Sequence, residues 1–246
     1  MALDVGGVSP AALAGALSIA GFGVLRAAVY FRMQYITAAM VARHVPRGGA
    51  RLVDLSPKDA AGRNLFYLPK DAVQVTVFDG ADKGAYLQEL GIRAGVPVDV
   101  RPVPAARMNL PPASVDAVVC VYGLSTTRDA AAVLREAARV LKPGKPFIFV
   151  ENVASANGVV RGLQAGLAAV HRATGWGAAP DKDSLRDVQA ISEFEDIQVE
   201  RIWDWQDPHV VGVAVKRAAP VLTQPAVSPL EKRVEALPSM RRRKRG

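Results

Sequence analysis

The sequence predicts an α/β fold built on a mostly parallel sheet, with an antiparallel hairpin at its C-terminal end. Two observations support this prediction. From residue 51 onward, short apolar and β-branched runs alternate with segments of helical periodicity, which is the pattern of parallel strands joined by crossover helices. Near the end of that region, the runs 197–205 and 209–217 are separated by only a few residues. Since so short a connection joins neighbouring antiparallel strands, these runs should form a hairpin.

The other elements follow in order along the chain. The run "VQVTVFD" (73–79) has the β-branched content of a strand, and "VDAVVCVYG" (115–123) is apolar throughout, as expected of a strand covered on both faces. The segment "RDAAAVLREAARVL" (128–141) is strongly amphipathic and is ended by Lys-Pro-Gly-Lys. Besides the hairpin, strands are predicted over 51–55, 73–79, 98–103, 115–123 and 146–154, and helices over 82–95, 128–141, 155–175 and 182–191.

Residues 1–47 form a separate hydrophobic region ahead of the main domain, which we place at 48–217. No charged residue occurs from Val5 to Leu25, and Ser9-Pro10 is typical of a helix start, with a hydroxyl cap followed by proline. About 20 apolar residues of helix are enough to span a bilayer. The segment is rich in Ala and Gly and only weakly hydrophobic, so two interpretations stay open. One is a membrane anchor over residues 5–31, and the other is a buried helix that covers the edge of the domain.

The charges around this segment favour the anchor and give its orientation. Only Asp4 precedes the apolar run, whereas four arginines follow it, at positions 26, 32, 43 and 47. By the positive-inside tendency, the main domain stays on the side from which the chain inserts. We therefore expect an intracellular, membrane-associated protein.

The basic character of the chain lies mostly in the C-terminal tail, residues 218–246. Of the formal net charge of +8, the tail carries +5, from seven basic and two acidic side chains, which leaves +3 for the rest. The body is therefore not typical of a nucleic-acid-binding domain, whereas Arg241–Arg245 could contact RNA, anionic lipid or an acidic protein. The single cysteine, Cys120, has no Cys or His neighbour at metal-ligand spacing. A reducing compartment fits, and no metal site is predicted.

Four stretches carry a resemblance to a known family. They are the strand ending at Asp54, the strand ending "VFDG", the strand "SVDAVVCVYGLS", and the helix-turn-strand "VLREAARVLKPGKPFIFVENVA". In this order they resemble class I S-adenosylmethionine-dependent methyltransferases (methyltransferase type 11). Taken with "DPHVVGVAVKR", the chain is most similar to the membrane-associated thiol methyltransferase-like family. The resemblance covers about residues 20 to 217 and implies a Rossmann-like fold with seven strands. It also favours a location in the endoplasmic reticulum or in the inner membrane of an organelle.

The resemblance also implies a cofactor site. The matching positions are Asp54, Ser56, Gly62, Asp79, Gly80, Met108 and Val121. In the family, the acid at Asp54 helps hold the amino-acid end of S-adenosylmethionine, and the acid at Asp79 accepts hydrogen bonds from the ribose. Asp79-Gly80 is also a common turn pair. His209 is the candidate base, although a histidine that only caps the final strand is the simpler interpretation.

The chain departs from the family at the loop after Asp54. The family pattern is acid-x-Gly-x-Gly-x-Gly, whereas this sequence reads "DLSPKDAAG" and keeps only Gly62 as a candidate loop glycine. An acid expected near the adenine is replaced by Ala105 or Ala106. A nicotinamide-dependent dehydrogenase fits less well, because its fingerprint needs the same glycines and lacks the terminal hairpin.

Two functions follow from these observations. The first is a non-catalytic subunit of a membrane or ribonucleoprotein assembly, which binds no cofactor. The alternative is an active S-adenosylmethionine-dependent methyltransferase that acts on a small thiol or apolar acceptor.

Overall fold

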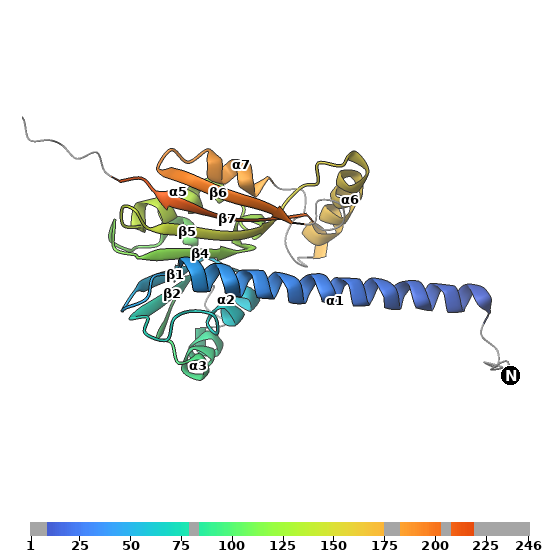
Figure 1. Ribbon diagram of the computed structural model, residues 1–246, viewed down its shortest axis with the longest axis horizontal. Helices are drawn as coiled ribbons and strands as arrows, with labels where there is room; N and C mark the ends of the chain where they lie inside the picture. Colours follow the sequence, from blue (N-terminus) through green and yellow to red (C-terminus); the bar gives the residue numbers. More distant parts are fainter. Residues whose placement is uncertain (1–8, 79–83, 175–182, 203–207, 219–246) are drawn as a thin grey trace, which may run out of the picture.

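The computed structural model describes residues 9–78, 84–174, 183–202 and 208–218. These residues form a seven-stranded sheet in the order β3-β2-β1-β4-β5-β7-β6 (Figure 1). The strands are β1 (Arg51–Asp54), β2 (Gln74–Phe78), β3 (Val98–Arg101), β4 (Ala117–Val121), β5 (Pro146–Asn152), β6 (Phe194–Ile202) and β7 (His209–Lys216). The first five strands are parallel, and β7 is inserted antiparallel between β5 and β6. The predicted fold class and the terminal hairpin are confirmed.

The strand β6 begins three residues earlier than predicted. Phe194 is buried and stacks on Phe147 of β5, with the ring centroids 5.3 Å apart. The register of β6 against β7 shifts between Glu195 and Gln198, where Asp196 has a φ of 48°. A sequence pattern of period two cannot cross such an irregularity, which explains why the prediction missed the first residues of the strand. The predicted end of the strand, at 203–205, lies outside the described residues.

Helices cover both faces of the sheet. They are α1 (Pro10–His44), α2 (Lys58–Asn64), α3 (Gly84–Ala94), η2 (Ala105–Arg107), α4 (Gly123–Thr126), α5 (Ala130–Val140), α6 (Gly158–Thr174) and α7 (Ser184–Gln189). One hydrophobic core joins the second half of α1 with α2, α3 and one face of the sheet. The other core joins α5 and α7 with the opposite face. Cys120 is buried in this second core as a free thiol, as its apolar surroundings in the sequence suggest.

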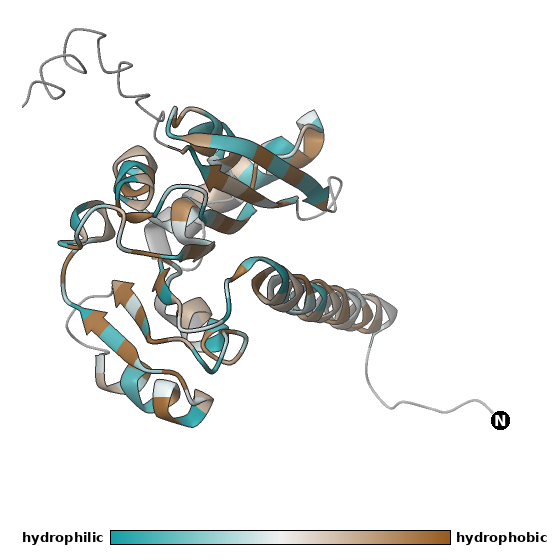
Figure 2. Cartoon of the chain, turned by 60° about the vertical axis from the view of Figure 1, so that its left-hand side comes forward, coloured by the Kyte–Doolittle hydropathy of each residue, from teal (hydrophilic) through white to brown (hydrophobic). Residues whose placement is uncertain are grey.

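The N-terminal helix α1 is a single element of 35 residues with two different environments. It begins as predicted, because the Ser9 side chain accepts a hydrogen bond from the backbone of Ala12. Val29, Met33 and Val41 are buried against the domain, at the spacing that places residues on one helix face. The described side chains from Ala12 to Ala28 are exposed. Each open interpretation of this segment therefore matches one half of the helix: the second half covers the domain, and the first half projects from it (Figure 2).

Three contacts give the direction in which α1 runs. The Arg63 guanidinium lies over the Tyr30 ring, 5.6 Å from its centroid, and the Tyr67 hydroxyl donates to Gln34 Oε1 at 3.0 Å. Further along, Val41 and Val45 line a groove with the segment 66–71 that leads into β2. The helix α1 therefore runs beside α2 and opposite to the parallel strands. Its projecting half leaves the domain at the carboxyl edge, which we define as the edge where β1, β2, β4 and β5 end (Figure 1).

Candidate functional site

The predicted site lies at the carboxyl edge, where β1 ends in Asp54. The Asp54 side chain is only 1% exposed and is held from two sides. Its Oδ1 accepts the backbone N–H of Ser56 at 2.8 Å, and its Oδ2 accepts the amide of Asn64 at 3.0 Å. Burial raises the pKa of Asp54, and the hydrogen bonds from Ser56 and Asn64 oppose that rise. Both oxygens of the Asp54 carboxylate are therefore occupied by hydrogen bonds within the protein.

The Ser56 hydroxyl fastens the loop after β1 to two neighbouring elements. Its Oγ accepts the backbone N–H of Val121, at the end of β4, at 2.8 Å. The same oxygen accepts the Asn64 amide, from α2, at 3.0 Å. We call Asp54, Ser56, Asn64 and the Val121 N–H the loop latch. Ser56 and Asn64 are 4% and 1% exposed, so the latch is closed to solvent.

The short loop Leu55–Pro57 offers no backbone donor to a ligand. The Leu55 N–H donates to the Val119 carbonyl at 2.8 Å, and the Ser56 N–H is bound to Asp54. Pro57 has no N–H, and α2 begins at the next residue. A phosphate- or carboxylate-binding loop depends on free N–H groups that point at the ligand. The described loop therefore does not fit a cofactor held by its backbone, and both oxygens of the Asp54 carboxylate accept hydrogen bonds from within the protein.

A second buried acid, Glu151, supports the neighbouring turn after β4. Glu151 lies at the end of β5 and is fully buried. Its two oxygens accept the backbone N–H groups of Leu124, at 2.8 Å, and Ser125, at 3.1 Å. The Cys120 thiol lies 3.5 Å from Oε1. Burial raises the pKa of Glu151 to about 7, against the opposing effect of these hydrogen bonds. Burial and the nearby carboxylates raise the pKa of Cys120, so its thiol stays protonated.

Gly123 allows this turn to approach the loop after β1. A Cβ at this position would collide with the Leu55 carbonyl oxygen and would lie 2.6 Å from the Cys120 Sγ. The residue before it, Tyr122, has a left-handed backbone conformation with a φ of 60°, which costs a non-glycine residue about 1–3 kcal/mol. The turn after β4 is therefore both close-packed and strained.

The structure brings some of the predicted residues together and separates others. Ser56 and Val121 meet in the loop latch with Asp54, as described above. Met108 follows η2 and is fully buried in the core beside α5, where its N–H donates to Glu136 at 3.0 Å. Asp79 and Gly80 lie outside the described residues. The predicted roles of these residues toward a cofactor stay predictions.

The interpretation of Gly62 as a loop glycine needs a correction. Gly62 lies inside α2, and a Cβ there would be 2.9 Å from Leu90 Cδ1 of α3. The absence of a side chain at this position is explained by the close packing of two helices. The loop itself, Leu55–Pro57, contains no glycine.

His209 lies at the start of β7, where it is paired with Asn152 of β5. It is 4% exposed, and its ring meets the Tyr122 ring edge-on, with the centroids 5.8 Å apart. The candidate base is therefore next to the strained turn after β4, at the same carboxyl edge of the sheet as the loop latch.

Sequence reasoning missed three residues of this site. The contribution of Asn64 depends on a helix turn that returns its amide to Asp54, and no local pattern marks that contact. Gly123 is required by a contact with Leu55, which is distant in sequence. Glu151 had a signal, because a glutamate at the end of a fully apolar strand must find buried hydrogen-bond donors.

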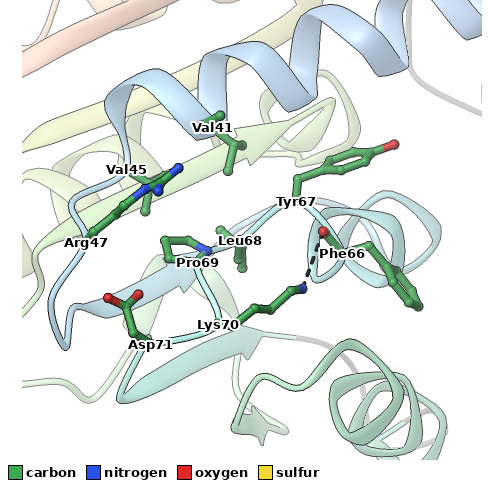
Figure 3. Close-up of a pocket in the computed structure, with 10 residues that line it drawn as sticks. Val41, Val45, Arg47, Phe66, Tyr67, Leu68, Pro69, Lys70 and Asp71 are labelled. Atoms are coloured by element: carbon green, nitrogen blue, oxygen red, sulfur yellow. Dashed lines mark hydrogen bonds between the residues drawn. The ribbon is translucent and has the colours of Figure 1, made fainter.

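A groove lies at the opposite edge of the sheet. Its volume is about 460 Å³, and Figure 3 shows the apolar side chains of Val41, Val45 and Leu68 together with the charged groups of Arg47 and Lys70 around it. The Lys70 ammonium is 3.4 Å from the Phe66 carbonyl oxygen. This groove is distant from the predicted site residues.

Comparison with known proteins supports the fold. A family model described as a methyltransferase domain matches residues 60–149, so the match begins after Asp54 and its loop. Among solved structures, the 4+2 cyclase SpnF is 18% identical, with a TM-score of 0.60 over 76% of this chain and 81% of that one. The YcgJ protein of Bacillus subtilis is 14% identical, with a TM-score of 0.59 over 75% of this chain and 100% of that one.

A third structure is phosphoethanolamine N-methyltransferase 2 of Haemonchus contortus, in complex with S-adenosylhomocysteine. It is 15% identical, with a TM-score of 0.57 over 75% of this chain and 53% of that one. A search of curated proteins finds no match. The chain has the Rossmann-like fold of class I methyltransferases. This fold is also that of a cyclase, so it does not specify the reaction.

Proposed function

We propose that this chain is a membrane-anchored, non-catalytic protein built on a methyltransferase fold, and that it acts as a structural subunit of a larger assembly. The observation that supports this most directly is the loop Leu55–Pro57, in which every backbone donor is used internally. A pocket that must accept a charged amino-acid cofactor needs donors and acceptors that face the ligand. Here the Asp54 carboxylate accepts a hydrogen bond from the Asn64 amide, and the Ser56 hydroxyl accepts one from the Val121 backbone.

The projecting half of α1 supplies the anchor in this proposal. Among the described residues, α1 is the one helix that is long and apolar enough to cross a membrane. Leu13, Leu17 and Val24 are exposed on it, and an apolar helix surface without a protein partner is stable in lipid. The basic tail, with Arg241–Arg245, provides a second contact to RNA or anionic lipid of the assembly. The location is an intracellular membrane, the endoplasmic reticulum or an organelle inner membrane, with the domain on the reducing side.

Titration calorimetry with S-adenosylmethionine on the full chain in detergent micelles tests the proposal. We expect no heat of binding above that of dilution. A second titration uses S-adenosylhomocysteine, which lacks the positive sulfonium, and should give the same result. Micromolar affinity for either ligand would overturn the non-catalytic interpretation.

An active methyltransferase on a small thiol or apolar acceptor is the second candidate. It is favoured by Tyr122, because a strained residue at the end of a central strand is a feature of functional sites, and by the buried His209 beside it. Methyl transfer from S-adenosylmethionine to a panel of thiols would support it. A His209→Phe variant, which keeps an aromatic ring beside Tyr122, should then lose activity, and circular dichroism should show that it keeps the native fold.

A further inference from the structure

The anchor leaves the domain at the carboxyl edge, and this fixes which side of the domain meets the membrane. Tyr30 contacts Arg63 of α2, and Asn64 next to Arg63 is bound to Asp54 at the end of β1. Tyr30 is therefore level with the carboxyl edge. From Pro10 to Ala28 the helix has about 19 residues, or roughly 29 Å, which matches the hydrocarbon core of a bilayer. No stretch of exposed helix is left over as a spacer between the bilayer and the domain.

The exposed residues at this junction are those expected at a membrane surface. Tyr30, Phe31 and Tyr35 are 45%, 70% and 75% exposed, directly after the apolar half of α1. Aromatic side chains gather at the level of lipid headgroups, because one part of the ring is apolar and the other meets water. In the sequence, Arg26 precedes and Arg32 follows Tyr30, and basic residues are typical of this boundary between a membrane helix and its intracellular end.

The helix α6 lies at the same edge. It follows β5, whose carboxyl end is Asn152, and Figure 1 places it at the end of the sheet from which α1 projects. Its inner face is fastened by Gln164, which binds the backbone of Val153 and Ser155 at 3.1 and 2.7 Å, and by the buried Ala168. Its outer face exposes Val159, which is 76% accessible.

The charge of the segment that contains α6 suits an anionic surface. From Val153 to Pro180 the sequence contains no acidic residue, whereas Arg161 and Arg172 are basic. The Arg161 side chain is exposed on α6, and its Nε donates to the Ser155 carbonyl oxygen at 3.0 Å. A helix with basic residues and an exposed apolar side chain is the kind that lies in the headgroup layer of a membrane.

We propose that the domain rests on the lipid bilayer through the carboxyl edge of its sheet, with the outer face of α6 in the headgroup layer. This inference rests on the anchor of the proposed function and adds the orientation of the domain. The site at the carboxyl edge then faces lipid. The groove of Figure 3, at the opposite edge, faces the aqueous side, where a protein partner can reach it.

Fluorescence quenching in vesicles tests this orientation. The full chain, with a cysteine introduced as Val159→Cys or Ala165→Cys on α6, is labelled with bimane in vesicles of phosphatidylcholine and phosphatidylserine. Ile92→Cys is the matched control, because Ile92 is an 82% exposed apolar residue near the end of α3, at the opposite edge. The unmodified chain measures background labelling at the buried Cys120.

We expect a nitroxide on the lipid headgroup to quench both α6 labels at least about twofold more than the Ile92 label, as for a helix buried about 5–10 Å into the interface. Aqueous iodide should give the reverse order. If the chain floats with the vesicles while iodide quenches all three labels equally, the orientation is wrong and the anchor stands. If the Ile92 label is quenched by lipid as strongly as those on α6, the orientation is also wrong. If the chain does not float with the vesicles, the anchor fails and this inference fails with it.

Discussion

The Ser56 hydroxyl lies 2.8 Å from the backbone nitrogen of Val121 and accepts its hydrogen bond, which joins the loop after β1 to the end of β4. The same oxygen accepts the Asn64 amide, so one buried side chain holds three elements together. In this fold ligands bind outside the carboxyl ends of the strands, so the bond lies at the edge of the sheet where a ligand site is expected. The loop latch, the buried acid beside it and the proposed anchor each have a measurable consequence.

The first prediction concerns Ser56→Ala. Removal of the hydroxyl leaves the Val121 N–H buried without its acceptor, which costs about 1–3 kcal/mol of unfolding free energy. Urea denaturation of the full chain in micelles measures the loss. Ser192→Ala, which removes an exposed hydroxyl, is the control and should change stability by less than about 0.5 kcal/mol. Equal stability of the two variants would contradict a structural role for the latch.

The second prediction concerns the pH dependence of stability. Burial raises the pKa of Glu151 from its ordinary value of 4.5 to about 7. Between these values the folded protein holds a proton that the unfolded chain releases. The unfolding free energy therefore falls as pH rises through this window, by up to about 3 kcal/mol, and is constant above it.

Glu151→Gln should flatten this dependence, because the amide does not titrate. Part of the slope should remain, since burial also raises the pKa of Asp54. Denaturation midpoints at several pH values from about 4.5 to 8, the window in which the raised pKa acts, measure the effect, with the exposed Glu200→Gln as the control. Parallel curves for wild type and Glu151→Gln would show that Glu151 is ionised in the folded protein throughout this range.

The third prediction compares two glycines. Gly123→Ala should destabilise the protein by about 3 kcal/mol or more, because the new methyl group meets the Leu55 carbonyl, which cannot move without opening the loop. Gly62→Ala should change stability by less than about 1 kcal/mol. The one close contact of its methyl group is with the end of the flexible Leu90 side chain, and alanine favours the helix by about 1 kcal/mol. Thermal unfolding of both variants distinguishes them, and a larger loss for Gly62→Ala would contradict the packing described here.

The fourth prediction concerns the proposed anchor. Leu17→Lys places a charge near the middle of the projecting half of α1, where Leu17 is 64% exposed. A lysine at the centre of a membrane helix costs about 3 kcal/mol, so the carbonate-resistant membrane fraction should fall sharply. Ile92→Lys adds the same charge to the domain surface and should leave that fraction unchanged. If neither variant alters membrane retention, α1 is not the element that holds the protein there.

Local sequence patterns were sufficient for the fold. Alternating apolar runs placed the strands, and the short connection before His209 predicted the terminal hairpin, because chain length limits which strands can pair. The helix start at Ser9 followed from a cap whose hydrogen bond reaches only to Ala12. Each of these features depends on residues close together in the chain.

The tertiary structure alone decided how the site is closed and how α1 is divided. In the sequence, Asp54 indicated which edge of the sheet carries the site. The hydrogen bonds from Asn64 to Asp54 and from Val121 to Ser56 join residues up to 65 positions apart in the chain, so no local pattern predicts them. The composition of the N-terminal segment left two interpretations open, a membrane anchor or a helix that covers the domain. Packing against the domain from Val29 onward made the second half of the helix a cover and left the first half exposed. The physical reason is the same in both cases, since burial and hydrogen-bond partners depend on which surfaces meet after folding.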